Sequence, residues 1–268
     1  MTTPTPSQPA GTPPAVMPAT GGVHFPEPRR RRIFLMRHGE AAYIRSDGSV
    51  TQDPRMVGLT PTGQVQARKQ AAVLASVPFD RAICSGLPRT VETATIVLAH
   101  RPEPTLEIVP ELEEIRGGGR EHPVTDMGAW LRHVANPWAS GADPDATFLG
   151  GERFADFAAR IVPAFDAILA DTRWTRLLLV LHGAVNRAIF NHIMNMPWQA
   201  RMTIEQDNAC LNIIDVDADA EGRPDRFLVR AVNLTAYDLN KSGIHYTSME
   251  ESARRLAEVL GVQGTPGG

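Results

Sequence analysis

The chain has 268 residues, a hydrophobic fraction of 43 %, a charged fraction of 21 % and a formal net charge of −3. This composition is ordinary for a globular protein and excludes a collagen-like, coiled-coil or wholly disordered chain. The small net charge gives no basic surplus for nucleic acid or an anionic membrane, and no apolar run approaches the roughly 20 residues of a membrane span. Two cysteines, Cys84 and Cys210, are too few for a disulfide framework. We therefore expect a cytoplasmic protein that binds neither nucleic acid nor membrane.

Both ends of the chain differ in composition from its middle. The first 28 residues hold 8 of the 22 prolines and no Lys or Arg, so they cannot bury enough apolar surface to offset the entropy of ordering. We predict a disordered tail over residues 1–31, a second one over 263–268, and a single domain over 32–262. The run Arg29–Arg32 leads directly into an apolar strand and is interpreted as the solvated entrance of that strand.

Between these ends, short apolar strands alternate with helices, which is typical of an α/β fold. The run 177–181 has five aliphatic residues in a row, as expected of a central strand buried on both faces. We predict a three-layer sandwich with a mostly parallel sheet and helices on both faces. The first helix is expected to turn Val65, Ala72, Val73 and Leu74 towards the core. In chain order the expected elements are a strand at 33–36, a helix capped by Thr60, a strand at 81–84, a helix at 88–98, a strand at 106–109, a helix at 153–170, a strand at 177–181, a helix at 185–194, a hairpin of strands at 211–216 and 226–232, and a last helix from about 248.

Residues of about 115–150 interrupt this alternation. They contain three consecutive glycines, three prolines and only one helix-like stretch, at about 126–134. A long irregular insertion in a compact domain is usually functional. We therefore predict an inserted cap or lid that faces the substrate.

Polar residues follow three of the predicted strands at the points where these strands end. His38 follows the first strand, Arg89 lies shortly after the second, and His182 follows 177–181. Ligands of open α/β sheets bind at the carboxyl ends of the strands, so these groups should converge. Arginine matches the oxygens of a phosphate group, and a neutral imidazole is a competent nucleophile. The acidic run Glu111–Glu114 offers a proton donor, with the choice between its members open.

Six segments resemble the histidine phosphatase superfamily, in its phosphoglycerate-mutase-like branch, and they stand in the family's order over about residues 32–240. The resemblance implies that His38 is the nucleophile and forms a phosphohistidine, that Glu114 is the proton donor, and that His182 stabilises the transferring phosphoryl group. The segments are Arg37-His38-Gly39-Glu40, Leu59-Thr60-Pro61-Thr62-Gly63, Ser85-x-Leu87-x-Arg89, Leu112-Glu113-Glu114, Gly150-Gly151-Glu152 and Val180-Leu181-His182-Gly183.

The same resemblance implies that Arg37, Arg89 and Gly183 bind the phosphate, and that no metal or cofactor is needed because the basic pocket neutralises it. The chain departs from the family pattern after Glu40, where Ala41-Ala42-Tyr43-Ile44 replaces residues that would contact phosphate. We expect Arg45, or alternatively Arg55, to compensate for them.

The expected function is therefore a metal-independent phosphomonoester phosphatase acting on a small phosphorylated metabolite. Scattered arginines of the insertion, Arg116, Arg120 and Arg132, hint at an acidic substrate. The alternatives are a phosphoglycerate-type mutase, a phosphoprotein phosphatase and a catalytically weak phosphate-binding protein. A mutase is less favoured because the segment after Glu114 lacks the His and Tyr of glycolytic mutases. A homodimer is kept as the alternative to a monomer.

Overall fold

A computed structural model describes residues 29–44, 49, 51, 53–118, 126–139, 143, 145–196 and 203–262. Most of the two predicted tails, at 1–28 and 263–268, and the candidate residue Arg45 lie outside these described residues. The first strand already begins at Arg30, two residues before the predicted domain boundary. No helix in the described part is long and apolar enough to cross a membrane.

One six-stranded sheet has the order β3-β2-β4-β1-β5-β6 and forms the middle of the molecule. β1, β2, β3 and β4 pair in parallel, whereas β5 is antiparallel to β1 and β6 is antiparallel to β5. The predicted mostly parallel sheet and the predicted hairpin are therefore confirmed. The strands are β1 (Arg30–Arg37), β2 (Arg81–Cys84), β3 (Leu106–Ile108), β4 (Arg176–Leu181), β5 (Leu211–Ala218) and β6 (Pro224–Leu234).

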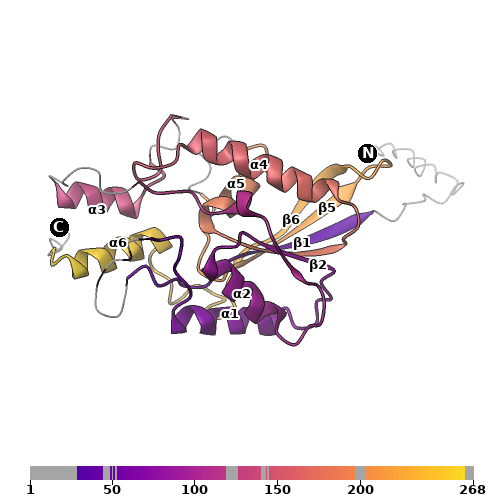
Figure 1. The fold of residues 1–268 in the computed structure, drawn as a ribbon, viewed down its shortest axis with the longest axis horizontal. Helices are drawn as coiled ribbons and strands as arrows, with labels where there is room; N and C mark the ends of the chain where they lie inside the picture. The colour runs from indigo at the N-terminus through magenta and orange to yellow at the C-terminus, as the bar shows by residue number, and fades with distance from the viewer. Residues whose placement is uncertain are drawn as a thin grey trace, which may run out of the picture.

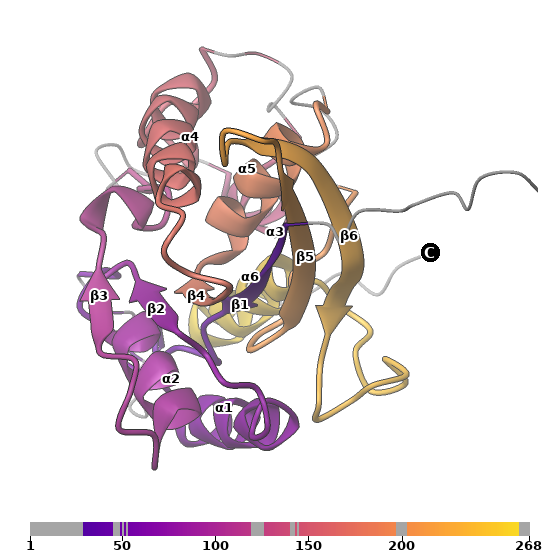
Figure 2. The same cartoon turned by 90° about the vertical axis from the view of Figure 1, so that its right-hand side faces the viewer.

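Helices cover both faces of the sheet, which gives the predicted three layers (Figure 2). Alternate residues of β1 point to opposite faces: Ile33 and Leu35 pack in the core under α4 and α5, whereas Phe34 and Met36 pack in the core on the other side, with residues of α2. Every residue of β4 from Leu177 to Leu181 is completely buried, as predicted for a central strand. The helices of the two layers are α4 (Phe154–Ala170) and α5 (Gly183–Ile193) on one face, and α1 (Pro61–Val73) and α2 (Pro88–Leu98) on the other.

Helix α1 begins as predicted, because the Thr60 hydroxyl accepts a hydrogen bond from Gly63 N. The prediction for its buried face was correct for Leu74, which is 2 % exposed, and wrong for Val65 and Val73, whose exposed fractions are 44 % and 58 %. Ala72 is exposed as well. Polar and small residues are buried instead. Gln66 Oε1 accepts from Glu40 N at 2.9 Å, and a buried backbone N–H must find such a partner. The helix therefore supports the loop after β1 through hydrogen bonds, which hydrophobic periodicity does not reveal.

In the arginine run, residues 30–32 belong to β1 and Arg29 lies just before it; Arg29 and Arg32 are exposed, as expected, whereas Arg31 is buried. The β1–β5 register places Arg32 opposite Asp215, and Arg32 Nε donates to the completely buried Asp215 Oδ1 at 2.6 Å. On the opposite face of the strand, Arg31 is only 6 % exposed and donates to the carbonyl oxygens of Leu169 and Asp171. The run thus joins β1 to β5 and to the end of α4.

Two further helices lie near the carboxyl ends of the parallel strands (Figure 1). These are α3 (Met127–Ala135), which belongs to the inserted segment, and α6 (Ser248–Val259), which packs against it. Helix α6 begins at the predicted position with a capping box, in which Thr247 is the N-cap and Glu250 its partner. The insertion thus contributes one helix at the end of the sheet where the candidate residues are found.

Candidate active site

The register of two parallel strands brings the two histidines together. Arg37 pairs with Leu181 across β1 and β4, so the residues that follow, His38 and His182, leave the sheet side by side. Their ring centroids are 5.2 Å apart with an interplanar angle of 65°. Both side chains are almost completely buried, at 1 % and 0 % exposure. The convergence expected at the carboxyl ends of the strands is therefore present.

His38 is arranged as a neutral nucleophile. Its Nδ1 lies 2.7 Å from Gly39 O, and because a carbonyl oxygen only accepts, Nδ1 carries the proton. The lone pair is then left on Nε2. Burial lowers the pKa of His38 well below its ordinary value, and the charges of Arg89 and Arg37 lower it further. The ring therefore stays unprotonated near neutral pH, as nucleophilic attack requires.

A hydrogen-bonded chain fixes the second histidine. Thr90 Oγ1 donates to Leu87 O at 2.8 Å, which leaves it to accept from Ser85 Oγ at 3.0 Å. Ser85 Oγ in turn accepts from His182 Nε2 at 2.7 Å. His182 Nδ1 is consequently buried without a hydrogen-bond partner among the described residues. Its free nitrogen is the one that a ligand beside His38 would meet.

Burial lowers the pKa of His182 well below its ordinary value, and Arg89, His38 and Arg37 act in the same direction. A phosphate dianion placed between these groups would oppose the effect, because a nearby negative charge favours the protonated imidazole. His182 can then offer a charged N–H to the phosphate from Nδ1.

Arg37 and Arg89 lie beside the two histidines, and each guanidinium donates to a backbone carbonyl group. Arg37 Nη1 donates to Gln206 O at 2.6 Å, and Arg89 Nη1 donates to Pro54 O at 3.0 Å. The Nε atoms of both are buried without a hydrogen-bond partner within the described part of the chain. The Arg89 guanidinium also lies 5.7 Å from the centroid of the Tyr43 ring. Both side chains are thus oriented but keep donors for an anion.

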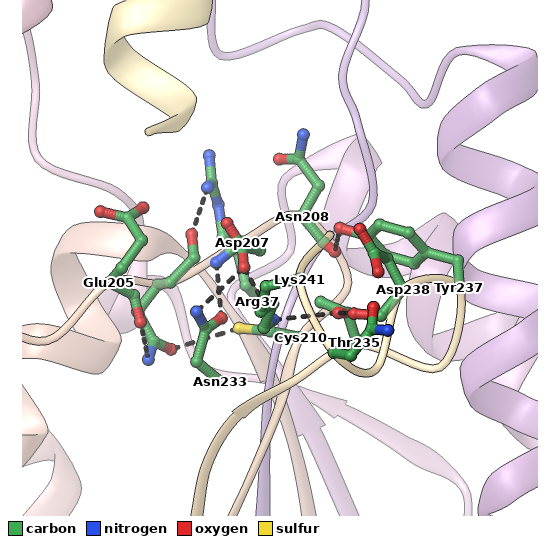
Figure 3. Close-up of polar contacts among 12 residues, drawn as sticks. Arg37, Glu205, Asp207, Asn208, Cys210, Asn233, Thr235, Tyr237, Asp238 and Lys241 are labelled. Carbon is green, nitrogen blue, oxygen red and sulfur yellow. Dashed lines mark hydrogen bonds and ion pairs between the residues drawn. The ribbon is translucent and has the colours of Figure 1, made fainter. Parts of the chain in front are cut away.

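A buried polar network supports Arg37, and sequence reasoning missed it. Gln206, whose carbonyl holds Arg37, accepts at Oε1 from Asn186 Nδ2 at 2.9 Å and from Asn212 Nδ2 at 2.8 Å. Figure 3 draws Arg37 with neighbours of this network. The neighbouring Asp207 forms an ion pair of 2.8 Å with Lys241. These residues form no local motif, because Asn186, Gln206 and Asn212 lie far from Arg37 in the chain.

The geometry separates the adjacent acidic residues. Glu114 Oε2 accepts from Ala184 N at 3.3 Å, in the first turn of α5 and two residues beyond His182. Both carboxylate oxygens of Glu113 instead accept from Arg55 Nη2, at 2.7 and 2.6 Å. Of these two carboxylates, Glu114 is the one that contacts the helix turn next to His182. Arg55, the alternative to Arg45, uses Nη2 for its pair with Glu113, and its contact with phosphate stays a prediction.

Gly39 is required by close approach, because a Cβ there would lie 2.4 Å from Gly63 O. A Cβ on Gly183 would meet only the ends of two flexible side chains, at 3.2 Å from Arg187 Nη1 and 3.4 Å from Arg37 Nε. Within the described residues, no group of three or more His, Cys, Asp or Glu side chains could hold a metal ion.

A family model described as "Histidine phosphatase superfamily (branch 1)" matches residues 33–224. The adenosylcobalamin/alpha-ribazole phosphatase of Escherichia coli (strain K12) is 28 % identical over 195 residues, covering 69 % of this chain and 90 % of that protein. A broad-specificity phosphatase of Saccharomyces cerevisiae is 27 % identical, covering 77 % and 86 %. A Yersinia enterocolitica protein named "Probable phosphoglycerate mutase GpmB" is 27 % identical, covering 69 % and 84 %. The crystal structure of the Shigella flexneri alpha-ribazole phosphatase shares the fold, with a TM-score of 0.59, 24 % identity and coverage of 75 % and 96 %.

Proposed function

The chain belongs to the histidine phosphatase superfamily and is a phosphatase, and from this premise we propose that it hydrolyses phosphomonoesters through a phosphohistidine at His38, without a metal ion. One observation carries the proposal. A neutral imidazole with its lone pair on Nε2 lies beside His182 and between two arginines that keep unused donors. This arrangement combines a nucleophile with a positively charged pocket for the phosphoryl oxygens.

In the first step, His38 Nε2 attacks phosphorus and forms the P–N bond while the bond from phosphorus to the ester oxygen breaks. The electron pair of that bond goes to the leaving oxygen, which takes a proton from the Glu114 carboxyl. In the second step, water attacks the phosphoryl group and gives its proton to the Glu114 carboxylate. The P–N bond then breaks and its electron pair returns to Nε2. The products are an alcohol and inorganic phosphate.

The pocket stabilises the negative charge of the transferring group. Arg37 and Arg89 can donate to its oxygens, and His182 can donate from Nδ1. Preorganised donors in a site shielded from water stabilise a transition state far more than the same groups in water, and these side chains are at most 9 % exposed. With these three donors in one pocket, we expect no metal ion to be needed to neutralise the phosphate.

We propose a small phosphorylated metabolite as the substrate, in keeping with the alpha-ribazole phosphatase named above. Release of inorganic phosphate from p-nitrophenyl phosphate in the presence of EDTA tests the reaction. We expect activity that survives chelation and is lost in His38→Ala. Activity that needs an added divalent metal, or that persists in His38→Ala, would contradict the proposal. Conversion of 3-phosphoglycerate to its isomer without phosphate release would favour a mutase instead.

A further inference from the structure

The segment that carries Glu114 has little regular structure of its own. After β3, only a short 3-10 helix, η1 (Pro110–Leu112), precedes it, and residues 113–118 belong to no helix or strand. Its backbone carbonyl groups therefore lack the partners that a helix or sheet would provide. Something outside the segment must fix the position of the acid.

Arg160, in the middle of α4, binds this segment through its backbone. Its Nη1 donates to Glu111 O and Glu113 O, both at 2.7 Å, and its Nη2 donates to Glu114 O at 3.0 Å. One rigid guanidinium thus binds the carbonyl groups of Glu111, Glu113 and Glu114. Arginine suits this role because its five N–H donors are held in a fixed plane.

Glu152, just before α4, holds Arg160 in turn. Arg160 Nε donates to Glu152 Oε1 at 2.8 Å, and Nη2 donates to Oε2 at 3.0 Å. The same Oε2 accepts from Arg116 N at 3.0 Å. The Arg160 and Glu152 side chains are only 20 % and 13 % exposed. Burial alone would raise the pKa of Glu152, but the hydrogen bonds from Arg160 and Arg116 N hold it below its ordinary value.

Glu114 is therefore held at its backbone and at its carboxylate. Arg160 binds its carbonyl oxygen, Ile115 N donates to Oε1 at 3.1 Å, and Ala184 N in the first turn of α5 donates to Oε2 at 3.3 Å. We propose that Arg160 and Glu152 are positioning residues that place the general acid of the reaction beside His182. This inference rests on the proposed function, in which Glu114 protonates the leaving oxygen.

The consequence for catalysis depends on the leaving group. A displacement of about 1 Å can cost on the order of 10²-fold in rate. p-Nitrophenolate departs without help from an acid, whereas a poorer leaving group needs the proton. Loss of the Arg160 contacts should therefore slow phenyl phosphate much more than p-nitrophenyl phosphate. A general structural weakening would slow both equally.

The test compares kcat/KM for a series of substituted phenyl phosphates in wild type, Arg160→Lys, Arg160→Met and Glu114→Gln. Arg160→Lys keeps the charge that His182 senses but loses the planar set of donors. We expect both Arg160 variants to lose about 10- to 100-fold with phenyl phosphate and less than about 3-fold with p-nitrophenyl phosphate, as Glu114→Gln does. The kcat/KM of Glu152→Gln for phenyl phosphate should lie between the values for wild type and Arg160→Lys. Adding Glu114→Gln to Arg160→Lys should cause little further loss, because both changes remove the same contribution.

Arg173→Met is the matched control. Arg173 follows the other end of α4 and also forms a two-point pair, with Asp171, but its side chain is 87 % exposed. In Arg173→Met, kcat/KM should depend on the leaving group as it does in the wild type. An unchanged dependence in Arg160→Lys, or an equal loss for all esters, would overturn the positioning role.

A crystal structure of Arg160→Lys gives a second readout that does not require turnover. We expect the Glu114 carboxylate to have moved away from Ala184 N. A carboxylate still bound to Ala184 N would overturn the positioning role. This separates the two proposals: absence of turnover in the wild type contradicts the proposed function, and an unmoved Glu114 contradicts the role of Arg160. If Glu114→Gln leaves the leaving-group dependence unchanged, Glu114 is not the acid and both assignments fail.

Discussion

Ser85 links His182 to Thr90 by hydrogen bonds, so replacing Ser85 should affect catalysis by His182. Replacing Ser85 with Ala removes the only oxygen within 2.7 Å of His182 Nε2 that the described residues provide, and His182 is completely buried. A buried N–H without a partner costs about 1–3 kcal/mol. The neutral ring can avoid this cost by carrying its proton on Nδ1 instead. The protonated ring cannot, so we expect the pKa of His182 in the phosphate complex to fall.

The expected loss of transition-state stabilisation arises because His182 Nδ1 would donate to the phosphoryl group from a neutral ring instead of a charged one. A hydrogen bond from a charged donor contributes about 1.5–3 kcal/mol and a neutral one about 0.5–1.5 kcal/mol, so the transition state loses about 1–1.5 kcal/mol. This corresponds to a fall of about 10-fold in kcat/KM. The assay is p-nitrophenyl phosphate hydrolysis as a function of pH, with the optimum of Ser85→Ala displaced to lower pH. Thr90→Val is the control with a smaller effect, because Ser85 can still accept from His182. A Ser85→Ala enzyme with wild-type kcat/KM and pH profile would refute the reasoning.

Other expectations concern stability. Burial depresses the pKa of His38 and His182 below 6.5, so the unfolded chain binds more protons on acidification. The contribution of the two neutral histidines to the free energy of unfolding is therefore fully present above about pH 6.5 and is lost as the pH falls below it. Urea unfolding between about pH 7.5 and 5 should show this decline, and His182→Gln should make the free energy of unfolding depend less steeply on pH. An equally steep dependence in the variant would contradict the depressed pKa. Gly39→Ala should lower the free energy of unfolding by about 1–3 kcal/mol, because the new Cβ would lie 2.4 Å from Gly63 O; urea titration checks this, and a loss below 0.5 kcal/mol would show that the backbone relaxes freely.

Much of the fold and the centre of the site could be predicted from the sequence. Strand ends followed by polar residues locate His38 and His182, and parallel pairing then requires them to meet. Motif spacing places Arg89 in the first turn of the helix that follows β2. These inferences succeed because each depends on a short segment and on the general geometry of parallel sheets.

What the sequence did not show depends on side-chain orientation and on contacts between distant segments. Glu113 and Glu114 are adjacent, and only the structure shows that one pairs with Arg55 while the other reaches α5. The buried role of Gln66 was missed because a polar residue on a helix is expected to face solvent. The role of Arg160 was missed because the carbonyl groups that it binds lie 46 to 49 residues away in the chain.

The central claim is that His38 carries the phosphoryl group during turnover. The most direct measurement is rapid alkaline quenching of the enzyme during turnover of a phosphomonoester, followed by mass spectrometry of the peptide that contains residues 37–40. We expect a phosphoryl group on His38 in the wild type, accumulating further in Glu114→Gln with p-nitrophenyl phosphate because water attack is then slowed. Steady phosphate release with no phosphorylated His38 at any quench time in either protein would contradict the account.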